Sequence, residues 1–306
     1  MSFTLFVDAR LALARDSLAG LSTGDALGAQ YFLPGSAAPD LLAGPLPPAP
    51  WEWTDDTEMA CSVFAELAHS GAVNPDRLAL AFAERGTPRR GYGSGAMAIL
   101  RLIRAGTPWP LAAASAFDGQ GSCGNGAAMR VGPLGAYFAD STARAAAQAR
   151  ASAEVTHAHP EGIAGAVAVA VAAALAARGR LDGHRPAPER LLAGIAAALD
   201  PGTEVQRSVS RAAGLLGRPM DLVVAELGNG SRVTAQDTVG FTLWVAATHL
   251  DDYPAAIRRC VEAGGDTDTT AAIVGAIVAA YTGVGTPGGV PEAWLSAREP
   301  LPAWLP

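Results

Sequence analysis

Residues 163–177 read IAGAVAVAVAAALAA, which is the longest apolar stretch of the chain. The stretch is 15 residues long and consists mainly of alanine and valine. A helix that crosses a membrane needs roughly 20 consecutive apolar residues, so this stretch is too short. It predicts a helix buried in the core of the protein.

The sequence on both sides of this stretch has helical periodicity as well. It contains no sustained alternation of apolar and polar residues and no Asn-Gly hairpin between strand-like runs, so we expect an all-α protein. The chain has 306 residues, 50% of them hydrophobic, enough for one large core, and we expect a single domain over residues 1–306. Helices are predicted over residues 5–29, 55–70, 75–85, 92–105, 110–116, 126–138, 142–156, 161–178, 188–199, 203–215, 220–227, 234–248, 253–262 and 268–282.

Two segments rich in proline interrupt this helical pattern. Residues 33–50 contain six prolines and end directly at the first acidic cluster described below. Long connections of this kind are often functional, so the segment is either a loop that covers a substrate or a plain surface crossover. Residues 285–306 are dense in glycine and proline and predict a surface tail, anchored by Trp294 and Trp304.

Composition excludes several classes of function. The chain has 22 arginines and no lysine, which rules out a Schiff-base lysine and a Walker-type phosphate site. A net charge of -7, spread along the chain, argues against a nucleic-acid-binding surface. The three cysteines lack any Cys-x-x-Cys spacing, which argues against a disulfide framework or a zinc site. The charged N-terminal stretch does not resemble a secretory signal, so we expect a cytoplasmic protein without a membrane segment.

Three glycines recur at every fourth residue of the first predicted helix, at Gly20, Gly24 and Gly28. They share one face of the helix and predict a seam where another backbone approaches closely. Asp25 lies in the middle of this seam. A carboxylate there is either buried and hydrogen-bonded or lies beside a metal site, and both alternatives remain open.

Two acidic clusters stand far apart in the chain, Trp53-Thr54-Asp55-Asp56-Thr57 and Gly264-Gly265-Asp266-Thr267-Asp268-Thr269-Thr270. Each precedes an apolar helix, so each is typical of a helix N-cap with acids in the first turn. Together the clusters also offer four carboxylates and several threonine hydroxyls, which is a ligand set for Mg²⁺, Mn²⁺ or Ca²⁺. The spacing favours a metal site over a pair of caps.

A glycine-rich segment, residues 119–126, precedes the predicted helix at 126–138. Glycine loops at helix starts can bind phosphate or diphosphate through backbone N–H groups, although a tight interhelical turn has the same composition. Further along, His157 and His159 flank a helix boundary. Their spacing does not place both on one helical face, so a polar helix junction is favoured over a two-histidine metal site, while a single histidine contacting a ligand remains possible.

In order and spacing, these motifs resemble those of the ADP-ribosylglycohydrolase family, which includes the dinitrogenase reductase activating enzyme and the ADP-ribosyl-acceptor hydrolases. The resemblance spans most of the chain. The segments that carry it are Gly24-Asp25-Ala26-Leu27-Gly28, Trp53-Thr54-Asp55-Asp56-Thr57, Arg90-Gly91-Tyr92-Gly93, residues 121–130, Thr156-His157 and Gly265-Asp266-Thr267-Asp268-Thr269.

The resemblance implies an all-helical domain with two Mg²⁺ or Mn²⁺ ions in a cleft. It implies that the chain hydrolyses the N- or O-glycosidic bond between ADP-ribose and an acceptor, which can be a protein side chain, a nucleobase or a small molecule. The implied metal ligands are Thr54, Asp55, Asp56, Asp266, Asp268 and Thr269, of which Asp55, Asp56 and Asp268 are the implied catalytic residues. The implied ADP-ribose contacts are Gly91, Phe117, Gly121, Ser122, Cys123, Gly124, Asn125, Gly126 and His157.

One departure from the family pattern opens a second interpretation. Many relatives carry a glutamate a few residues after the Gly-Asp-Ala-Leu-Gly motif, whereas this chain reads Ala29-Gln30-Tyr31-Phe32-Leu33-Pro34 there. Either another carboxylate, such as Glu52, takes its place, or the chain is a non-catalytic or weakly catalytic module that binds ADP-ribose. For both alternatives we expect a monomer.

Overall fold

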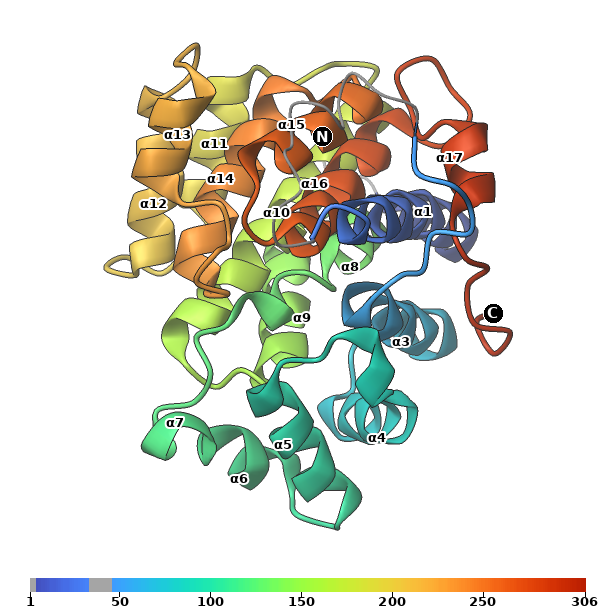
Figure 1. Cartoon of the computed structure of the whole chain (residues 1–306), viewed down its shortest axis with the longest axis vertical. Coiled ribbons are helices and arrows are strands. Elements are labelled where there is room, and N and C mark those ends of the chain that lie inside the picture. Colours follow the sequence, from blue (N-terminus) through green and yellow to red (C-terminus); the bar gives the residue numbers. More distant parts are fainter. Residues whose placement is uncertain (1–3, 33–45) are drawn as a thin grey trace.

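The computed structural model describes residues 4–32 and 46–306, and that part of the chain is built from helices without a named strand (Figure 1). The long helices are α1 (Val7–Ala29), α3 (Asp55–Ser70), α4 (Pro75–Arg85), α5 (Ser94–Arg104), α9 (Thr142–Glu154), α10 (Pro160–Leu181), α11 (Pro188–Ala196), α12 (Glu204–Gly214), α13 (Met220–Leu227), α14 (Ala235–Thr248), α15 (Tyr253–Ala263) and α16 (Thr267–Thr282). The short helices are η1 (Pro88–Arg90), α6 (Trp109–Ala114), α7 (Ala116–Gly119), η2 (Asn125–Ala127), α8 (Gly132–Tyr137) and α17 (Glu292–Ala297). The all-α prediction is confirmed.

Helix α10 forms the centre of the core, as the apolar stretch predicts. It lies among α8, α9, α14 and α16 (Figure 1), and most of its residues are fully buried. Within the described residues it is the one helix long and apolar enough to cross a membrane, but 78% of that apolar stretch is buried inside the protein. The small side chains of its alanines and glycines let neighbouring backbones come close. The carbonyl of Ala170, for example, contacts the bare Cα of Gly135 in α8.

The glycines of α1 form the predicted seam, and the helix against them is α16. A side chain at Gly24 would overlap the carbonyl oxygen of Ala271, and one at Gly28 would overlap the carbonyl oxygen of Thr267. The hydroxyl of Thr267 donates a hydrogen bond of 3.0 Å to the carbonyl of Gly28. The seam therefore fixes the first turn of α16, which carries the second acidic cluster, against the end of α1.

Some predicted elements differ from the structure. The helix expected over residues 126–138 is divided into η2 and α8, because Pro133 cannot donate the backbone hydrogen bond that would continue a helix through it. The predicted helix over 92–105 begins only at Ser94. Helix α17 lies inside the segment predicted to be a tail.

The segment after residue 285 packs against the start of the first acidic cluster. Trp294 is buried and makes edge-to-face contacts with Trp51 and Tyr253, at ring distances of 6.4 and 6.2 Å. The backbone of Trp51 pairs with the residues around Arg298. Trp304 remains 41% exposed, so only one of the two expected anchors is buried. Of the proline-rich segment 33–50, residues 33–45, and with them the predicted covering loop, lie outside the described residues.

Candidate functional site

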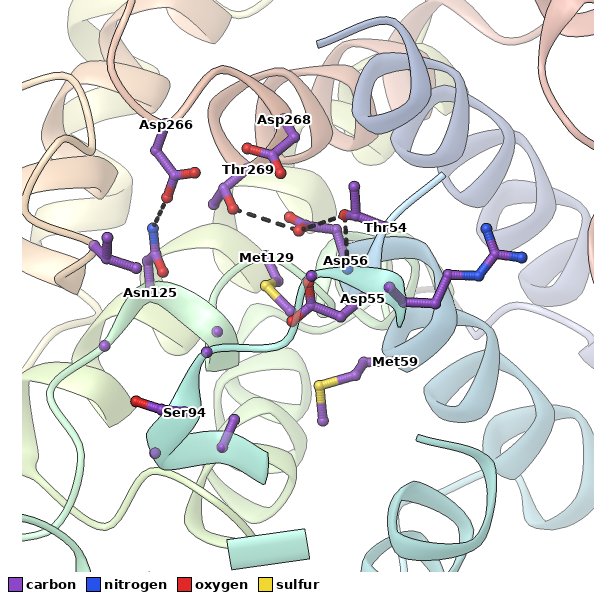
Figure 2. A pocket seen from close by; sticks show the side chains of 18 of the residues that line it. Thr54, Asp55, Asp56, Met59, Ser94, Asn125, Met129, Asp266, Asp268 and Thr269 are labelled. Carbon is purple, nitrogen blue, oxygen red and sulfur yellow. Dashed lines mark hydrogen bonds between the residues drawn. The ribbon is translucent and has the colours of Figure 1, made fainter. Parts of the chain in front are cut away.

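A cavity of about 900 Å³ opens between the end of α1, the first turns of α3 and α16, and the glycine-rich segment (Figure 2). It brings together most of the residues singled out in the sequence. The predicted site residues that line it are Thr54, Asp55, Asp56, Gly91, Phe117, Ser122, Cys123, Gly124, Asn125, Gly126, His157, Asp266, Asp268 and Thr269. Gly121 does not line it, because the backbone of residues 158–159 lies against its Cα.

The first acidic cluster is a helix cap that also faces the cavity. Thr54 is the N-cap of α3, and its hydroxyl oxygen accepts a hydrogen bond of 3.3 Å from the backbone N–H of Asp56. Asp25 accepts bonds from the backbone N–H of Thr54 (3.0 Å) and of Thr57 (3.1 Å) and from both hydroxyls. Asp25 is therefore buried and hydrogen-bonded, which is the first of the two alternatives for this residue, and it also adjoins the first acidic cluster.

The second acidic cluster does not serve as a cap. Asp266 occupies the N-cap position of α16, yet its side chain makes no capping hydrogen bond. Its carboxylate instead accepts a bond of 2.7 Å from the side-chain amide of Asn125, which also donates to Thr238 at 3.1 Å. The interpretation of the clusters as two helix caps therefore fails at this position.

Three carboxylates from three helices converge at the floor of the cavity. One oxygen from each of Asp25, Asp56 and Asp268 lies within 4.8 Å of the others. The Oδ1 atoms of Asp56 and Asp268 are buried and have no hydrogen-bond partner among the described residues. Figure 2 shows Thr269 and Thr54 on either side of Asp56, with hydrogen bonds of 3.4 and 3.1 Å to its carboxylate. Buried acceptors without donors are what a bound cation satisfies.

The raised pKa values of these carboxylates also indicate a cation site. Burial, opposed by hydrogen bonds from Thr57 and Thr54 and reinforced by the charge of Asp268, raises the pKa of Asp25 to about 7. Burial and Asp268 raise the pKa of Asp266 to about 8. In the described part of the chain, no arginine or histidine forms an ion pair with any of the acids in the cavity floor. A divalent cation would lower these pKa values by stabilising the ionised forms.

Burial is also the main cause of the shifts at the first cluster. It raises the pKa values of Asp55 and Asp56 well above the ordinary range, with further contributions from the charges of Asp25 and Asp268. Asp55 lies outside the group of three oxygens and faces Gly91, where an added methyl group would stand 3.5 Å from its Oδ1 atom. Asp55 and Asp266 thus extend the acidic surface to either side of the triad.

The glycine-rich segment lines the cavity, but much of its backbone is already engaged. The N–H of Gly124 donates to the hydroxyl of Ser122 at 3.2 Å, and the N–H of Asn125 donates to the carbonyl of Val233 at 3.2 Å. Gly121 donates to Ala116 at 2.9 Å. An anion nest can therefore use only the amides of Ser122, Cys123 and Gly126, which have no backbone acceptor in the described chain. The sequence did not reveal the pairing with residues 233–235.

An exposed aromatic side chain stands at the rim of the cavity. Phe117 is 62% exposed, has a φ of 51°, and faces Gly95 at the start of α5. A bulky residue in the left-handed region is unfavourable and persists where the surroundings hold it. Phe32, 55% exposed, and Glu52 also line the cavity.

His157 lines the cavity beside Gly124 and Gly126 of the glycine-rich segment and is 5% exposed. Burial, with the charge of Arg130, lowers its pKa to about 3, so the side chain is neutral. His159 does not line the cavity and is the N-cap of α10, accepting a bond of 3.1 Å from the N–H of Glu161. The two histidines therefore do not form a metal site together, as expected from their spacing. Arg130 and Thr156, which contact His157 or each other, were not singled out in the sequence as functional residues.

Comparisons with known proteins agree with this geometry. The family model for ADP-ribosylglycohydrolase matches residues 7–305. ADP-ribosylhydrolase ARH3 from Bos taurus is 30% identical, over 94% of this chain and 89% of its own, and the protein of that name from Mus musculus is 30% identical over 93% and 87%. A solved structure described as an ADP-ribosylglycohydrolase-related protein complex superposes with a TM-score of 0.68, at 28% identity, over 95% of this chain and 94% of its own.

The family match covers nearly the whole described chain, and the relatives align over most of their own length. The all-helical fold agrees with what the sequence motifs implied. The chain belongs to the ADP-ribosylglycohydrolase family, a family of metal-dependent hydrolases.

Proposed function

We propose that this protein is a hydrolase that depends on two Mg²⁺ or Mn²⁺ ions and cleaves the bond between the distal ribose of ADP-ribose and an acceptor. The observation that carries the proposal is the orphaned oxygens of Asp56 and Asp268 beside a carboxylate, Asp266, that caps nothing. Five buried or half-buried acids with two unpartnered oxygens constitute a donor set for hard cations, and the residues present fit such ions.

The proposed ligands are Thr54, Asp55, Asp56, Asp266, Asp268 and Thr269. Asp25, which holds both the N–H and the hydroxyl of Thr54, orients this ligand from behind. When bound, the ions supply Lewis-acid stabilisation of the ribose hydroxyls and of an attacking water. The residues of the chain bind the substrate, hold the ribose over the acidic floor and accept the proton of the water, a role for which a carboxylate of the floor such as Asp55 is suited.

The glycine-rich side of the cavity supports the nucleotide part of the proposal. The free amides of the glycine-rich segment and the side chain of His157 face the cavity from that side, and Phe117 offers a ring surface at the rim. These groups suit the diphosphate and the base of ADP-ribose. Because all of the site residues belong to one chain, we propose a monomer. We also propose a cytoplasmic location, because the three free cysteines fit a reducing compartment.

The experiment that tests the proposal measures release of ADP-ribose from arginine-, serine- and nucleobase-linked substrates with Mg²⁺ or Mn²⁺. We expect release by the wild-type protein, none after chelation with EDTA, and recovery when Mn²⁺ is returned. Asp55→Asn should abolish release, while Asp221→Asn, an exposed acid in the first turn of α13, should not. Full activity of the chelated protein or of Asp55→Asn would refute the proposal.

A binding module is the second candidate, and the apolar rim around Phe32 favours it. The acid that relatives carry there is replaced by an exposed aromatic ring. This alternative predicts calorimetric binding of ADP-ribose in Mn²⁺ without release from any of the three substrate classes. Glu52→Gln separates the two candidates further, because it should lower turnover only if Glu52 replaces the missing acid.

A further inference from the structure

Arg130 is a buried cation without a carboxylate partner. It is 0% exposed, and no salt bridge includes it among the described residues. Its Nη1 atom donates to the hydroxyl of Thr156 at 3.0 Å and to the carbonyl of Gly126 at 3.3 Å, and its Nη2 atom donates to the carbonyl of Ser152 at 2.6 Å. A guanidinium group has donors only, so each group that it contacts must accept a hydrogen bond from it.

The consequence for Thr156 is a fixed direction of its hydroxyl proton. The oxygen accepts from Arg130, and it lies 2.7 Å from Nδ1 of His157. Thr156 is fully buried, and its hydroxyl makes no other hydrogen bond among the described residues. If Nδ1 carried a proton, the hydroxyl proton would be left buried without a partner, which is unfavourable. The hydroxyl therefore donates to Nδ1.

The ring of His157 then has its own proton on Nε2. This atom lies on the cavity side, beside two glycines: an added methyl group would stand 3.3 Å from Nε2 at Gly124 and 3.1 Å from it at Gly126. The described residues supply no acceptor for Nε2. Glycine at both positions thus leaves a hydrogen-bond donor open to the cavity.

We propose that Arg130 and Thr156 are positioning residues, which fix His157 in the Nε2–H tautomer so that it always donates, and never accepts, a hydrogen bond in the cavity. The bound group at this place must be a hydrogen-bond acceptor. The identity of this acceptor rests on the proposed function: it is an oxygen of the ADP-ribose diphosphate. The two hydrogen bonds that join Arg130, Thr156 and His157 form a relay from guanidinium to hydroxyl to imidazole. This relay does not depend on the identity of the ligand.

The tautomer is measured by ¹⁵N NMR of the full chain labelled in its histidine rings, with the His157→Gln spectrum assigning the signal. We expect a protonated Nε2 and an unprotonated Nδ1 in the wild-type protein and in Thr156→Ser. In Thr156→Val, which cannot donate, a fraction with protonated Nδ1 should appear. A protonated Nδ1 in the wild-type protein, or an unchanged tautomer in Thr156→Val, would overturn the relay.

Binding of ADP-ribose in Mn²⁺ tests the ligand part. Thr156→Val should raise the Kd about tenfold, while Thr156→Ser stays within about threefold. His157→Gln, whose amide reaches the position of Nε2, should bind more tightly than His157→Asn, whose amide stands near Nδ1. Equal binding by all four variants would overturn the assignment of a ligand to Nε2–H. If the wild-type protein binds no ADP-ribose, the proposed function fails while the NMR result still decides the relay.

Discussion

The two sides of the cavity have opposite chemistry. The acidic half, consisting of Asp25, Asp55, Asp56, Asp266 and Asp268, has more acceptors than the protein can satisfy, and burial raises several of their pKa values. The donor half, consisting of residues 122–126 with His157 and the buried Arg130 that supports it, has a buried cation, a neutral ring and free amides. A ligand that suits both halves brings cations to one side and anionic oxygens to the other.

The comparison also separates two ways of building a site. The acidic half joins helices from the two ends of the chain, and the glycine seam between α1 and α16 sets its geometry. The part of the donor half that holds His157 is joined by short hydrogen bonds among Arg130, Thr156 and His157. The segment before it also bonds to the acidic half, through Asn125 and Asp266, and pairs with Val233. Substitutions away from the bond between Asn125 and Asp266 should therefore damage one half without the other, and the following four experiments test this.

The largest effect is expected from a substitution at the centre of the acidic half. Asp268→Asn removes a charge from the carboxylate triad, and we expect kcat/KM for release of ADP-ribose to fall by about a hundredfold or more. The ¹⁵N signals of His157 should not change, because its ring is held through Arg130 and Thr156. Kinetics of the matched variant Asp221→Asn provide the control, and a similar loss in both variants would contradict the prediction.

The second effect concerns the seam. Gly28→Ala forces a methyl group onto the carbonyl of Thr267, and we expect a loss of about 1–3 kcal/mol in the free energy of unfolding, together with weaker Mn²⁺ binding. Urea unfolding and metal titration measure the two quantities. Gly214→Ala, in helix α12 with open space around it, is the matched control and should lose no stability. Unchanged Mn²⁺ affinity in Gly28→Ala would show that the seam does not set the acidic half.

The third effect belongs to the rim of the donor half. Phe117→Ala removes the exposed ring, and the Kd for ADP-ribose should rise about tenfold through lost stacking on the base. The Kd for ribose 5-phosphate, which has no base, should stay unchanged. Leu111→Ala, an equally exposed apolar residue outside the cavity, is the control. Calorimetry gives all these constants, and equal losses for both ligands would contradict stacking.

The smallest effect is a dependence of metal-induced stability on pH. In the metal-free protein the folded-state pKa values of Asp25, about 7, and Asp266, about 8, lie above the ordinary aspartate value of 3.8. Between pH 3.8 and about 8 the folded state of the metal-free protein binds more protons than the unfolded state. Its free energy of unfolding therefore falls as the pH rises through this range. Mn²⁺ displaces the protons, and its effect should therefore be larger at pH 8 than at pH 6.

Thermal unfolding with EDTA or Mn²⁺ at both pH values checks this dependence. We expect the Mn²⁺-induced increase in Tm to be a few degrees greater at pH 8, on the scale of about 2–4 °C per kcal/mol for a chain of this size. K⁺ at matched ionic strength controls for screening. Equal increases at both pH values would indicate that the acids of the floor do not bind the metal.

The sequence predicts those parts of the molecule that depend on local patterns. The apolar stretch 163–177 identifies the central helix, and the three glycines of α1 identify the seam. The acidic clusters and the glycine-rich segment identify the acids and the glycine loop that line the cavity. Local signals suffice here because periodicity, close-approach glycines and acids at helix starts are properties of neighbouring residues.

Features that depend on tertiary contacts escape such a prediction. That Asp266 makes no capping bond follows from Asn125, which is distant in sequence. Which amides of the glycine-rich segment remain free follows from its pairing with Val233 and Ala235. Arg130 is one of 22 arginines, and nothing in its neighbours indicates that it is buried behind His157.

The junction of α1 and α16 has a consequence for how the protein forms. Asp25 and Asp56 are close in the sequence, whereas Asp268 lies 212 positions after Asp56 and is synthesised correspondingly later. The cluster of the three therefore depends on long-range contacts, which form late because a long loop must close first. Under the proposed function, metal binding would then mark a chain that has completed folding, because a partly synthesised or partly folded chain does not assemble the three carboxylates.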